Sequence, residues 1–203
     1  MTGPPISALL IPASFNYFLS TYFRLLPYFT ANITSNMANT LPGAASTNSM
    51  YKVLEQPLGT ARHVRIITIG AGASGINMIR TLRTTLTNYT HIVYEKNPKV
   101  GGTWYENRYP GCKCDIPAHN YQYSWKPNQG WSSFFGSAEE IEAYFCRVCE
   151  EEDLGREIRT EHRVVEARWN ERGIWELKIE DLRTGTVCDD YCHFLLDASG
   201  ILK

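Results

Sequence analysis

Three glycines in a short run give this sequence its clearest sign of a ligand-binding site. Gly70, Gly72 and Gly75 form a GxGxxG pattern directly after the apolar run Val64–Ile69. In such a pattern the first glycine permits a tight turn and the second lets backbone approach a phosphate. The third allows a helix to pack closely on a strand. The pattern therefore predicts that backbone N–H groups bind a pyrophosphate.

An acidic residue stands at the distance that such a site requires. Glu95 comes 20 residues after Gly75, at the end of a second apolar run, His91–Tyr94. A carboxylate there can accept hydrogen bonds from both hydroxyls of a ribose, which disfavours a ribose carrying a 2′-phosphate. NAD and FAD both remain as ligands on this evidence. The alternative is a tight strand-to-helix turn with an unrelated surface glutamate.

The elements around the motif predict an α/β fold. Residues 64–69 are apolar and β-branched, as in a buried parallel strand, and residues 91–94 repeat that character. Between them, apolar residues recur at three- and four-residue spacing from Ile76 to Leu86, which predicts a helix. Ser137 followed by Glu140 is a capping box, so a second helix should begin there.

The last third of the chain predicts antiparallel strands. Residues 163–180 alternate between apolar and polar around a turn at 170–173. A further turn at 183–185 leads to one strand over 191–196, which ends near Asp197.

Composition and charge divide the chain and exclude some classes of partner. The 203 residues carry a formal net charge of −1, so the chain offers no basic surface for nucleic acid. Residues 1–54 contain no acid, and residues 6–29 are apolar and aromatic with interruptions at Pro12, Asn16 and Pro27. We expect 1–54 to be an irregular leader and linker before a folded part at 55–203. The leader is interpreted as disordered or weakly membrane-associating through residues 6–29, with an anchor or targeting signal as the alternative.

Six cysteines form three close pairs, which raises the question of zinc or redox chemistry. The pairs are Cys112 and Cys114, Cys146 and Cys149, and Cys188 and Cys192. The CxxC pair lies in the middle of a predicted helix, away from the helix N-terminus that would stabilise a thiolate. Zinc needs four ligands from paired turns. We expect no metal site, and we interpret the cysteines as small buried packing residues.

Four stretches resemble a known family. They are GAGASG (70–75), YEKN (94–97), GGTWYENRYPGCKCDIPAHNYQYSW (101–125) and LLDASG (195–200). Together they are similar to the FAD-binding module of class B flavin monooxygenases, of the Baeyer–Villiger type found in fungal secondary metabolism. The resemblance runs from about residue 52 to residue 201. It implies an α/β, Rossmann-like FAD-binding domain, with a parallel sheet and a β-meander insertion, that is incomplete and preceded by the leader.

An aromatic-rich segment agrees with a flavin ligand. Nine of the chain's 25 aromatic residues fall between Trp104 and Phe135. Such density suits the wall of a pocket around a flat ring, and Gly101 and Gly102 would let backbone close on the cofactor. The alternative is a hydrophobic core beneath a long loop, and for Phe134 and Phe135 core packing is the preferred interpretation.

The resemblance assigns individual residues to the cofactor site. It implies that Thr103, Trp104, Glu106, Asp115, Ile116 and Tyr121 line the FAD site. Lys113, Cys114 and Asp115 would lie where the nicotinamide cofactor reaches the flavin, and the backbone of Val164 would contact the adenine. The matching stretches also contribute Ala73, Ser74, Lys96, Gly102 and Tyr105. Asp115 is the one catalytic candidate, with the role of positioning an active-site arginine.

The resemblance further implies an activity. Members of the family use NADPH, FAD and O2 to convert a ketone to an ester or lactone, or to oxygenate a soft heteroatom. A polyketide or terpenoid ketone in secondary metabolism is the expected small-molecule substrate, and the cytoplasm the expected location. The printed sequence lacks the family's second GxGxxG and its F-x-G-x-x-x-H-x-x-x-W fingerprint. Two hypotheses follow: a shortened monooxygenase or one that works with a partner chain, and a non-catalytic flavin-binding remnant or accessory protein.

Overall fold

The computed structural model describes residues 57, 59–60 and 62–201. The expected leader and linker, residues 1–54, lie outside the described residues, so their predicted character stays a prediction. From residue 62 onward the chain alternates strands and helices in one structural unit. No helix in this described part has both the length and the apolar character that crossing a bilayer requires.

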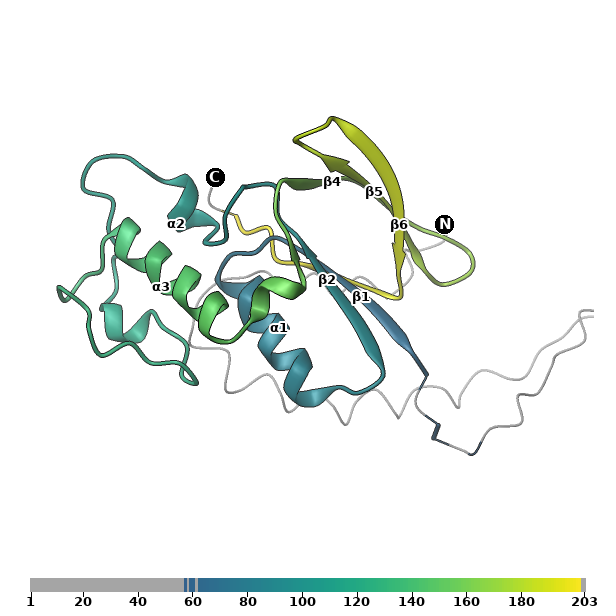
Figure 1. Ribbon diagram of the computed structural model, residues 1–203, viewed down its shortest axis with the longest axis horizontal. Helices are drawn as coiled ribbons and strands as arrows, with labels where there is room; N and C mark the ends of the chain where they lie inside the picture. Colours follow the sequence, from purple (N-terminus) through teal and green to yellow (C-terminus); the bar gives the residue numbers. More distant parts are fainter. Residues whose placement is uncertain (1–56, 58, 61, 202–203) are drawn as a thin grey trace, which may run out of the picture. The chain divides into compact units, whose positions relative to one another are not determined.

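A four-stranded parallel sheet forms the centre of this unit (Figure 1). Its order is β3-β2-β1-β7, made of β1 (Val64–Ile69), β2 (Tyr89–Tyr94), β3 (Ile158–Arg159) and β7 (Phe194–Asp197). Helix α1 (Ala73–Thr85) connects β1 to β2. The predicted α/β, Rossmann-like arrangement is therefore confirmed.

The register of the sheet decides where the motif residues lie. Val64 pairs with Tyr89 and Ile69 pairs with Tyr94, so β1 and β2 end side by side. Gly70 and Glu95, the residues that follow these strands, therefore leave the sheet at the same edge. In open parallel sheets this carboxyl edge is where ligands bind.

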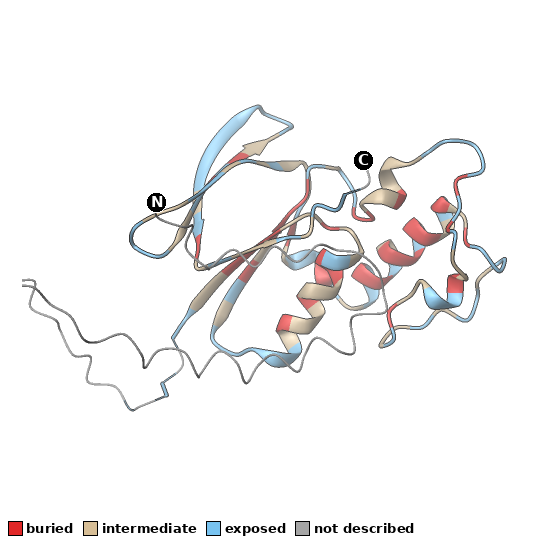
Figure 2. Ribbon diagram, turned by 180° about the vertical axis from the view of Figure 1, so that it is seen from behind, coloured by how far each residue is buried: buried red, intermediate tan, exposed pale blue. Residues whose placement is uncertain are grey.

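Helices cover one face of the sheet. A buried cluster that includes Ile76, Ile79 and Val93 lies between α1, α3 (Ala138–Glu151) and the sheet, and Figure 2 shows buried residues along both helices. The segment between β2 and α3 adds the short α2 (Thr103–Glu106) and a 3-10 turn, η2 (Ala118–Asn120), and a second 3-10 turn, η3 (Leu154–Arg156), follows α3.

The predicted cap of α3 is half formed. The Ser137 hydroxyl accepts a hydrogen bond from the Glu140 N–H at 3.2 Å, as expected. The Glu140 carboxylate does not complete the capping box, because its two oxygens accept from the N–H and the hydroxyl of Ser132.

A three-stranded antiparallel meander covers the other face. It consists of β4 (His162–Trp169), β5 (Trp175–Asp181) and β6 (Thr186–Cys192), in that order. Leu177, Ile179 and Cys192 from the meander pack against Ile67 and Tyr94 of the parallel sheet.

The prediction of one strand over 191–196 was wrong. The chain ends β6 at Cys192 and begins β7 at Phe194, so these residues belong to two different sheets. His193 makes the change: its N–H donates to the Arg65 carbonyl oxygen at 2.8 Å, and its Nδ1 accepts the Arg65 N–H at 2.9 Å. No glycine, proline or other turn residue marks this junction in the sequence, so the apolar run predicts one strand.

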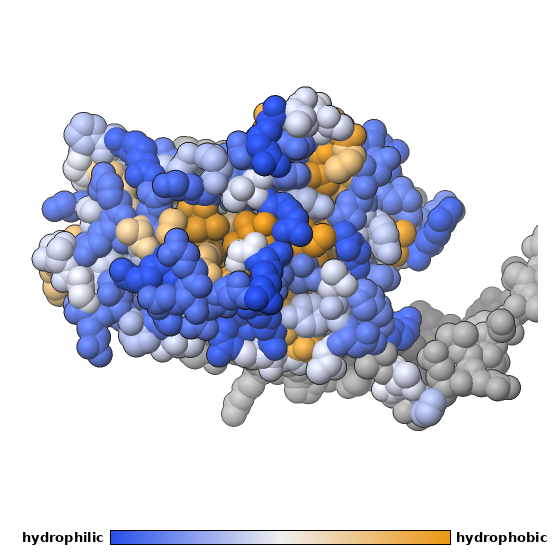
Figure 3. Space-filling view, in the orientation of Figure 1, coloured by the Kyte–Doolittle hydropathy of each residue, from blue (hydrophilic) through white to orange (hydrophobic). Residues whose placement is uncertain are grey.

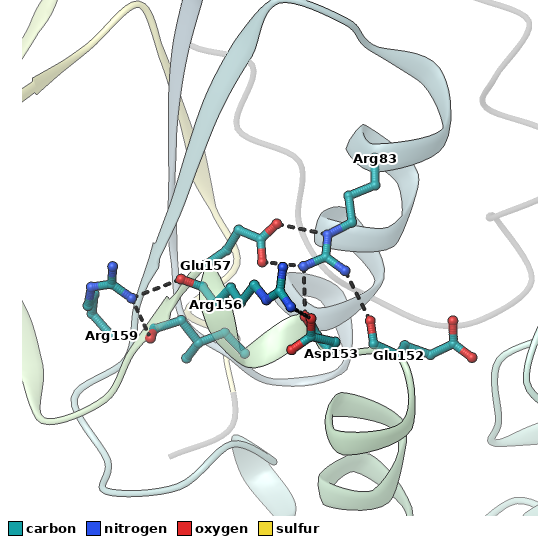
Figure 4. A network of polar contacts seen from close by, with 7 residues as sticks. Arg83, Glu152, Asp153, Arg156, Glu157 and Arg159 are labelled. Carbon is teal, nitrogen blue, oxygen red and sulfur yellow. Dashed lines mark hydrogen bonds and ion pairs between the residues drawn. The ribbon is translucent and has the colours of Figure 1, made fainter.

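Two polar clusters join these layers. Asp190 of β6 accepts hydrogen bonds from Arg65 and from the Tyr94 hydroxyl, each at 2.8 Å, and burial together with Asp190 raises the pKa of Tyr94. On the helical face, Arg83 near the end of α1 binds both carboxylate oxygens of Glu157. It also donates to the backbone oxygens of Glu152 and Asp153 (Figure 4). These contacts tie the end of α1 to the turn that follows α3.

Candidate functional site

The glycine loop occupies the predicted position between β1 and α1. Gly70 has a φ of +97°, and a Cβ there would lie 2.7 Å from the Ala198 carbonyl oxygen. A Cβ on Gly75 would lie only 2.0 Å from the Gly70 carbonyl oxygen, so helix and strand pack as closely as the motif predicts. Both positions therefore require glycine for structural reasons.

A second pair of glycines lies against the first loop. The N–H of Gly101 donates to the Ala71 carbonyl oxygen at 3.0 Å. Gly102 has a φ of +54°, and a Cβ there would lie 3.0 Å from the Gly72 Cα. The backbones of Gly72 and Gly102 thus meet at a point where neither has a side chain. We call this meeting point the cradle, and a Cβ on Gly102 would fill it.

Glu95 connects the end of β2 with this loop. Its side chain is buried, with 3% of the residue exposed. The carboxylate accepts the N–H of Ala71 at 2.7 Å and the N–H of Asn97 at 2.8 Å. The expected ribose contact stays a prediction, since the bonds in the structure go to backbone donors.

The residues after Glu95 reach α2. Lys96 forms an ion pair with Glu106 at 2.9 Å, and the Asn97 amide donates to the same carboxylate oxygen at 2.9 Å. The structure therefore brings together Gly70, Gly72, Ala73, Ser74, Gly75, Glu95, Lys96, Gly102 and Glu106, all of them predicted site residues.

This part of the site fits a dinucleotide. Helix α1 begins at Ala73 without a side-chain cap and without an acidic residue in its first turn. Its first N–H groups and the positive end of its dipole thus suit a phosphate. Gly72 and Gly102 carry no side chains, so none from these two positions would stand between a phosphate and the backbone.

The aromatic residues form a second group. The Trp104 indole N–H donates to the Tyr121 hydroxyl at 2.9 Å, and their rings meet edge to face at 5.3 Å. Burial raises the pKa of the Tyr121 hydroxyl, and the bond from Trp104 opposes that effect. Ile116 packs at the border of the same cluster. The guanidinium of Arg108 lies over the Tyr105 ring, with its central carbon 5.3 Å from the ring centre.

The remaining predicted residues are more dispersed. Lys113 and Asp115 are exposed, whereas Cys114 between them is buried, and burial raises the pKa of its thiol. Thr103 begins α2, and its carbonyl oxygen accepts from Asn107. Val164 lies in β4 beside a bulge, two residues from His162, whose N–H donates to the Glu95 carbonyl oxygen.

Known proteins share this sequence pattern. Residues 68–138 match the family model of the NAD(P)-binding Rossmann-like domain. An FAD-binding monooxygenase of Dothistroma septosporum is 46% identical over 146 residues, which cover 70% of this chain and 23% of the relative. A Baeyer–Villiger monooxygenase of Streptomyces coelicolor is 38% identical over 130 residues, 63% of this chain and 24% of the relative. Over this stretch the chain is similar to FAD-binding and Baeyer–Villiger monooxygenases.

The fold supports the same relationship. The crystal structure of OTEMO in complex with FAD and NADP superposes with a TM-score of 0.59 at 32% identity, covering 68% of this chain and 25% of that one. The apolar band on the face in Figure 3 crosses the area where Figure 1 places α2 and the C-terminal segment. The chain spans about a quarter of the length of the curated monooxygenases it matches.

Two predictions about packing were wrong. Phe134 and Phe135 are 65% and 42% exposed, because they lie on a surface loop whose backbone, and not its side chains, pairs with residues 114–118. Cys188 is exposed on the open edge of β6. The other cysteines agree better with the prediction of burial. Four are buried and one is half-buried: Cys112, Cys114, Cys149 and Cys192, and Cys146 respectively. Burial raises the pKa of Cys149 and of Cys192 to about 12, which disfavours a thiolate.

Three contributors to the site were missed from the sequence. Asn97 connects Glu95 to Glu106 through its N–H and its side-chain amide. Ala71 contributes both backbone groups to neighbouring segments, and the Tyr123 hydroxyl donates to the Ala73 carbonyl oxygen at 2.6 Å. The signals available were the position of Ala71 inside the glycine motif and of Asn97 directly after the acid. Nothing local distinguished Tyr123 from its aromatic neighbours.

Proposed function

We propose that this chain binds FAD as part of a monooxygenase that uses NADPH and O2 to oxygenate a small molecule. The observation that carries the proposal is the meeting of Gly72, Gly102 and the buried Glu95 at the start of α1. Unpaired N–H groups there suit a pyrophosphate, and the free lone pairs of Glu95 suit a ribose. The relatives named as FAD-binding monooxygenases support FAD over NAD as the ligand.

The residues of this chain would bind and orient the cofactor. The first turn of α1 would hold the pyrophosphate, Glu95 the ribose and the backbone of Val164 the adenine. Trp104, with Tyr121 fixed by its indole N–H, would border the flavin. Lys113 and Asp115 are solvent-accessible and would face the nicotinamide side. When bound, the flavin supplies the oxygen-transfer chemistry, and NADPH supplies the electrons.

The reaction we propose is Baeyer–Villiger oxygenation of a ketone, in the biosynthesis of a secondary metabolite such as a polyketide or terpenoid. Relatives named as Baeyer–Villiger monooxygenases support the choice of reaction. The second candidate is a flavin-binding accessory protein without turnover. The observation that favours it is that the residues brought together around Gly72, Gly102 and Glu95 suit the binding of a dinucleotide and include no catalytic candidate.

The test is a titration of the full chain with FAD, followed by flavin fluorescence and absorbance, and then by NADPH oxidation with and without a ketone. Gly102→Ala should weaken FAD binding about tenfold or more, since its Cβ would enter the cradle at a left-handed φ. Gly155→Ala is the matched control, because no atom lies within 4 Å of its added Cβ.

The outcomes separate the two candidates. FAD binding with ketone-dependent NADPH oxidation supports the monooxygenase. FAD binding without NADPH oxidation supports the accessory protein. A chain that binds no FAD contradicts both.

A further inference from the structure

Glu95 already has partners inside the protein. Its Oε2 accepts the N–H of Ala71 at 2.7 Å, and its Oε1 accepts the N–H of Asn97 at 2.8 Å. Ala71 is the residue between the first two glycines of the motif, and it is fully buried. The acid that is expected to hold the ribose therefore also holds the loop that is expected to hold the pyrophosphate.

Ala71 is fixed on both sides. While Glu95 binds its N–H, the N–H of Gly101 binds its carbonyl oxygen at 3.0 Å. The peptide unit is planar and trans, so a fixed Ala71 carbonyl directs the next N–H, that of Gly72, to the opposite side. The orientation of the phosphate-binding N–H groups thus depends on the two bonds to Ala71.

We infer that Glu95 is a positioning residue for the glycine loop as well as the ribose ligand, which rests on the proposed binding of FAD at this loop. A carboxylate offers about four lone-pair positions, so two backbone bonds leave room for both ribose hydroxyls. Glutamine cannot replace it, because its NH2 group would face one of the two backbone N–H donors. A neutral side chain of the same shape therefore loosens the loop.

The first test needs no cofactor. Amide hydrogen exchange at Ala71 should become at least about tenfold faster in Glu95→Gln than in the natural chain, since a buried N–H loses a charged acceptor. Glu157→Gln is the control: that carboxylate also makes two hydrogen bonds, but to Arg83 near the other end of α1. It should leave the exchange rate of Ala71 unchanged. Equal rates in the natural chain and in Glu95→Gln would overturn the inference.

The second test separates positioning from ribose binding. Adenosine carries the ribose without phosphates, whereas ADP carries both groups. If Glu95 positions the loop, Glu95→Gln lowers the affinity for ADP by a factor about tenfold larger than the factor by which it lowers the affinity for adenosine. The same loss for both ligands would mean that Glu95 acts on the ribose alone.

The two proposals can fail separately. A natural chain that binds no FAD contradicts the proposed function, but the exchange rate of Ala71 still tests the positioning role. Where Glu95→Gln does not fold, the natural chain supplies the measurement: an NMR coupling across the hydrogen bond, between the Ala71 amide nitrogen and the Glu95 carboxylate carbon. Its absence in the folded chain would overturn the inference.

Discussion

A buried histidine should make the stability of this chain depend on acid pH. His91 lies in β2 with 6% of its surface exposed, and its Nε2 is 2.8 Å from the Thr68 hydroxyl oxygen. Its Nδ1 is buried and has no hydrogen-bond partner within the described part of the chain. Burial lowers the pKa of His91 to about 4, with Arg83 adding to this effect and Glu157 opposing it.

The magnitude follows from proton linkage. An unfolded histidine binds its proton near pH 6.5, whereas folded His91 binds it only near pH 4. Between these values the unfolded state holds more protons, so the free energy of unfolding falls as the pH falls. The loss is about 1.4 kcal/mol for each pH unit, or about 3 kcal/mol across the window.

The assay compares urea unfolding of the natural chain and of His91→Gln from pH 7 to pH 4. Glutamine keeps a polar partner for Thr68 but does not titrate, and the carboxylates common to both chains cancel in the difference. The advantage of the natural chain over the variant should shrink by about 3 kcal/mol by pH 4. A difference that stays constant across this range would refute the assignment of His91 as a buried neutral group.

Three further contacts give stability predictions that urea or thermal unfolding can check. Gly75→Ala should cost about 3 kcal/mol, because its Cβ would lie 2.0 Å from the Gly70 carbonyl oxygen, whereas Gly155→Ala should stay within about 0.5 kcal/mol. Arg83→Lys should lower the free energy of unfolding by about 1–2 kcal/mol, since lysine keeps the charge but not the planar fork that binds Glu157 and two carbonyl oxygens. A change no larger than that of the exposed Arg156→Lys would contradict this. Ser137→Ala should cost about 1 kcal/mol through loss of the α3 cap, and an unchanged midpoint would show that Ser137 caps nothing in solution.

The parts of the fold that were predicted correctly have local causes. The strand before Gly70, the helix after it and the cap at Ser137 each follow from patterns within a dozen residues. The split between β6 and β7 has a different cause, since it depends on Arg65, a residue more than 120 positions away in the sequence. A period-two pattern records which face a residue occupies, but not which sheet it joins.

The site shows the same division. The spacing of Gly75 and Glu95 was sufficient to place an acid beside the glycine loop, and the structure puts it there. The sequence could not show that Glu95 would bind the Ala71 N–H, because that donor becomes its neighbour only when β1 and β2 pair in register. Likewise, core packing was the preferred interpretation for Phe134 and Phe135, whereas the backbone of that loop places both rings outside.

The positions of the predicted site residues suggest an experiment that separates cofactor binding from turnover. The proposed pyrophosphate and ribose positions are built from half-buried backbone at Gly72 and Gly102 and from the buried Glu95, so changes there should act on affinity first. Lys113 and Asp115 are exposed and contribute nothing to the cradle at Gly72. Asp115→Asn should therefore leave FAD affinity within about threefold of the natural chain while lowering any ketone-dependent NADPH oxidation. A parallel loss of both would support the placement of Asp115 in the FAD site that the family resemblance implies, and would contradict this division of roles.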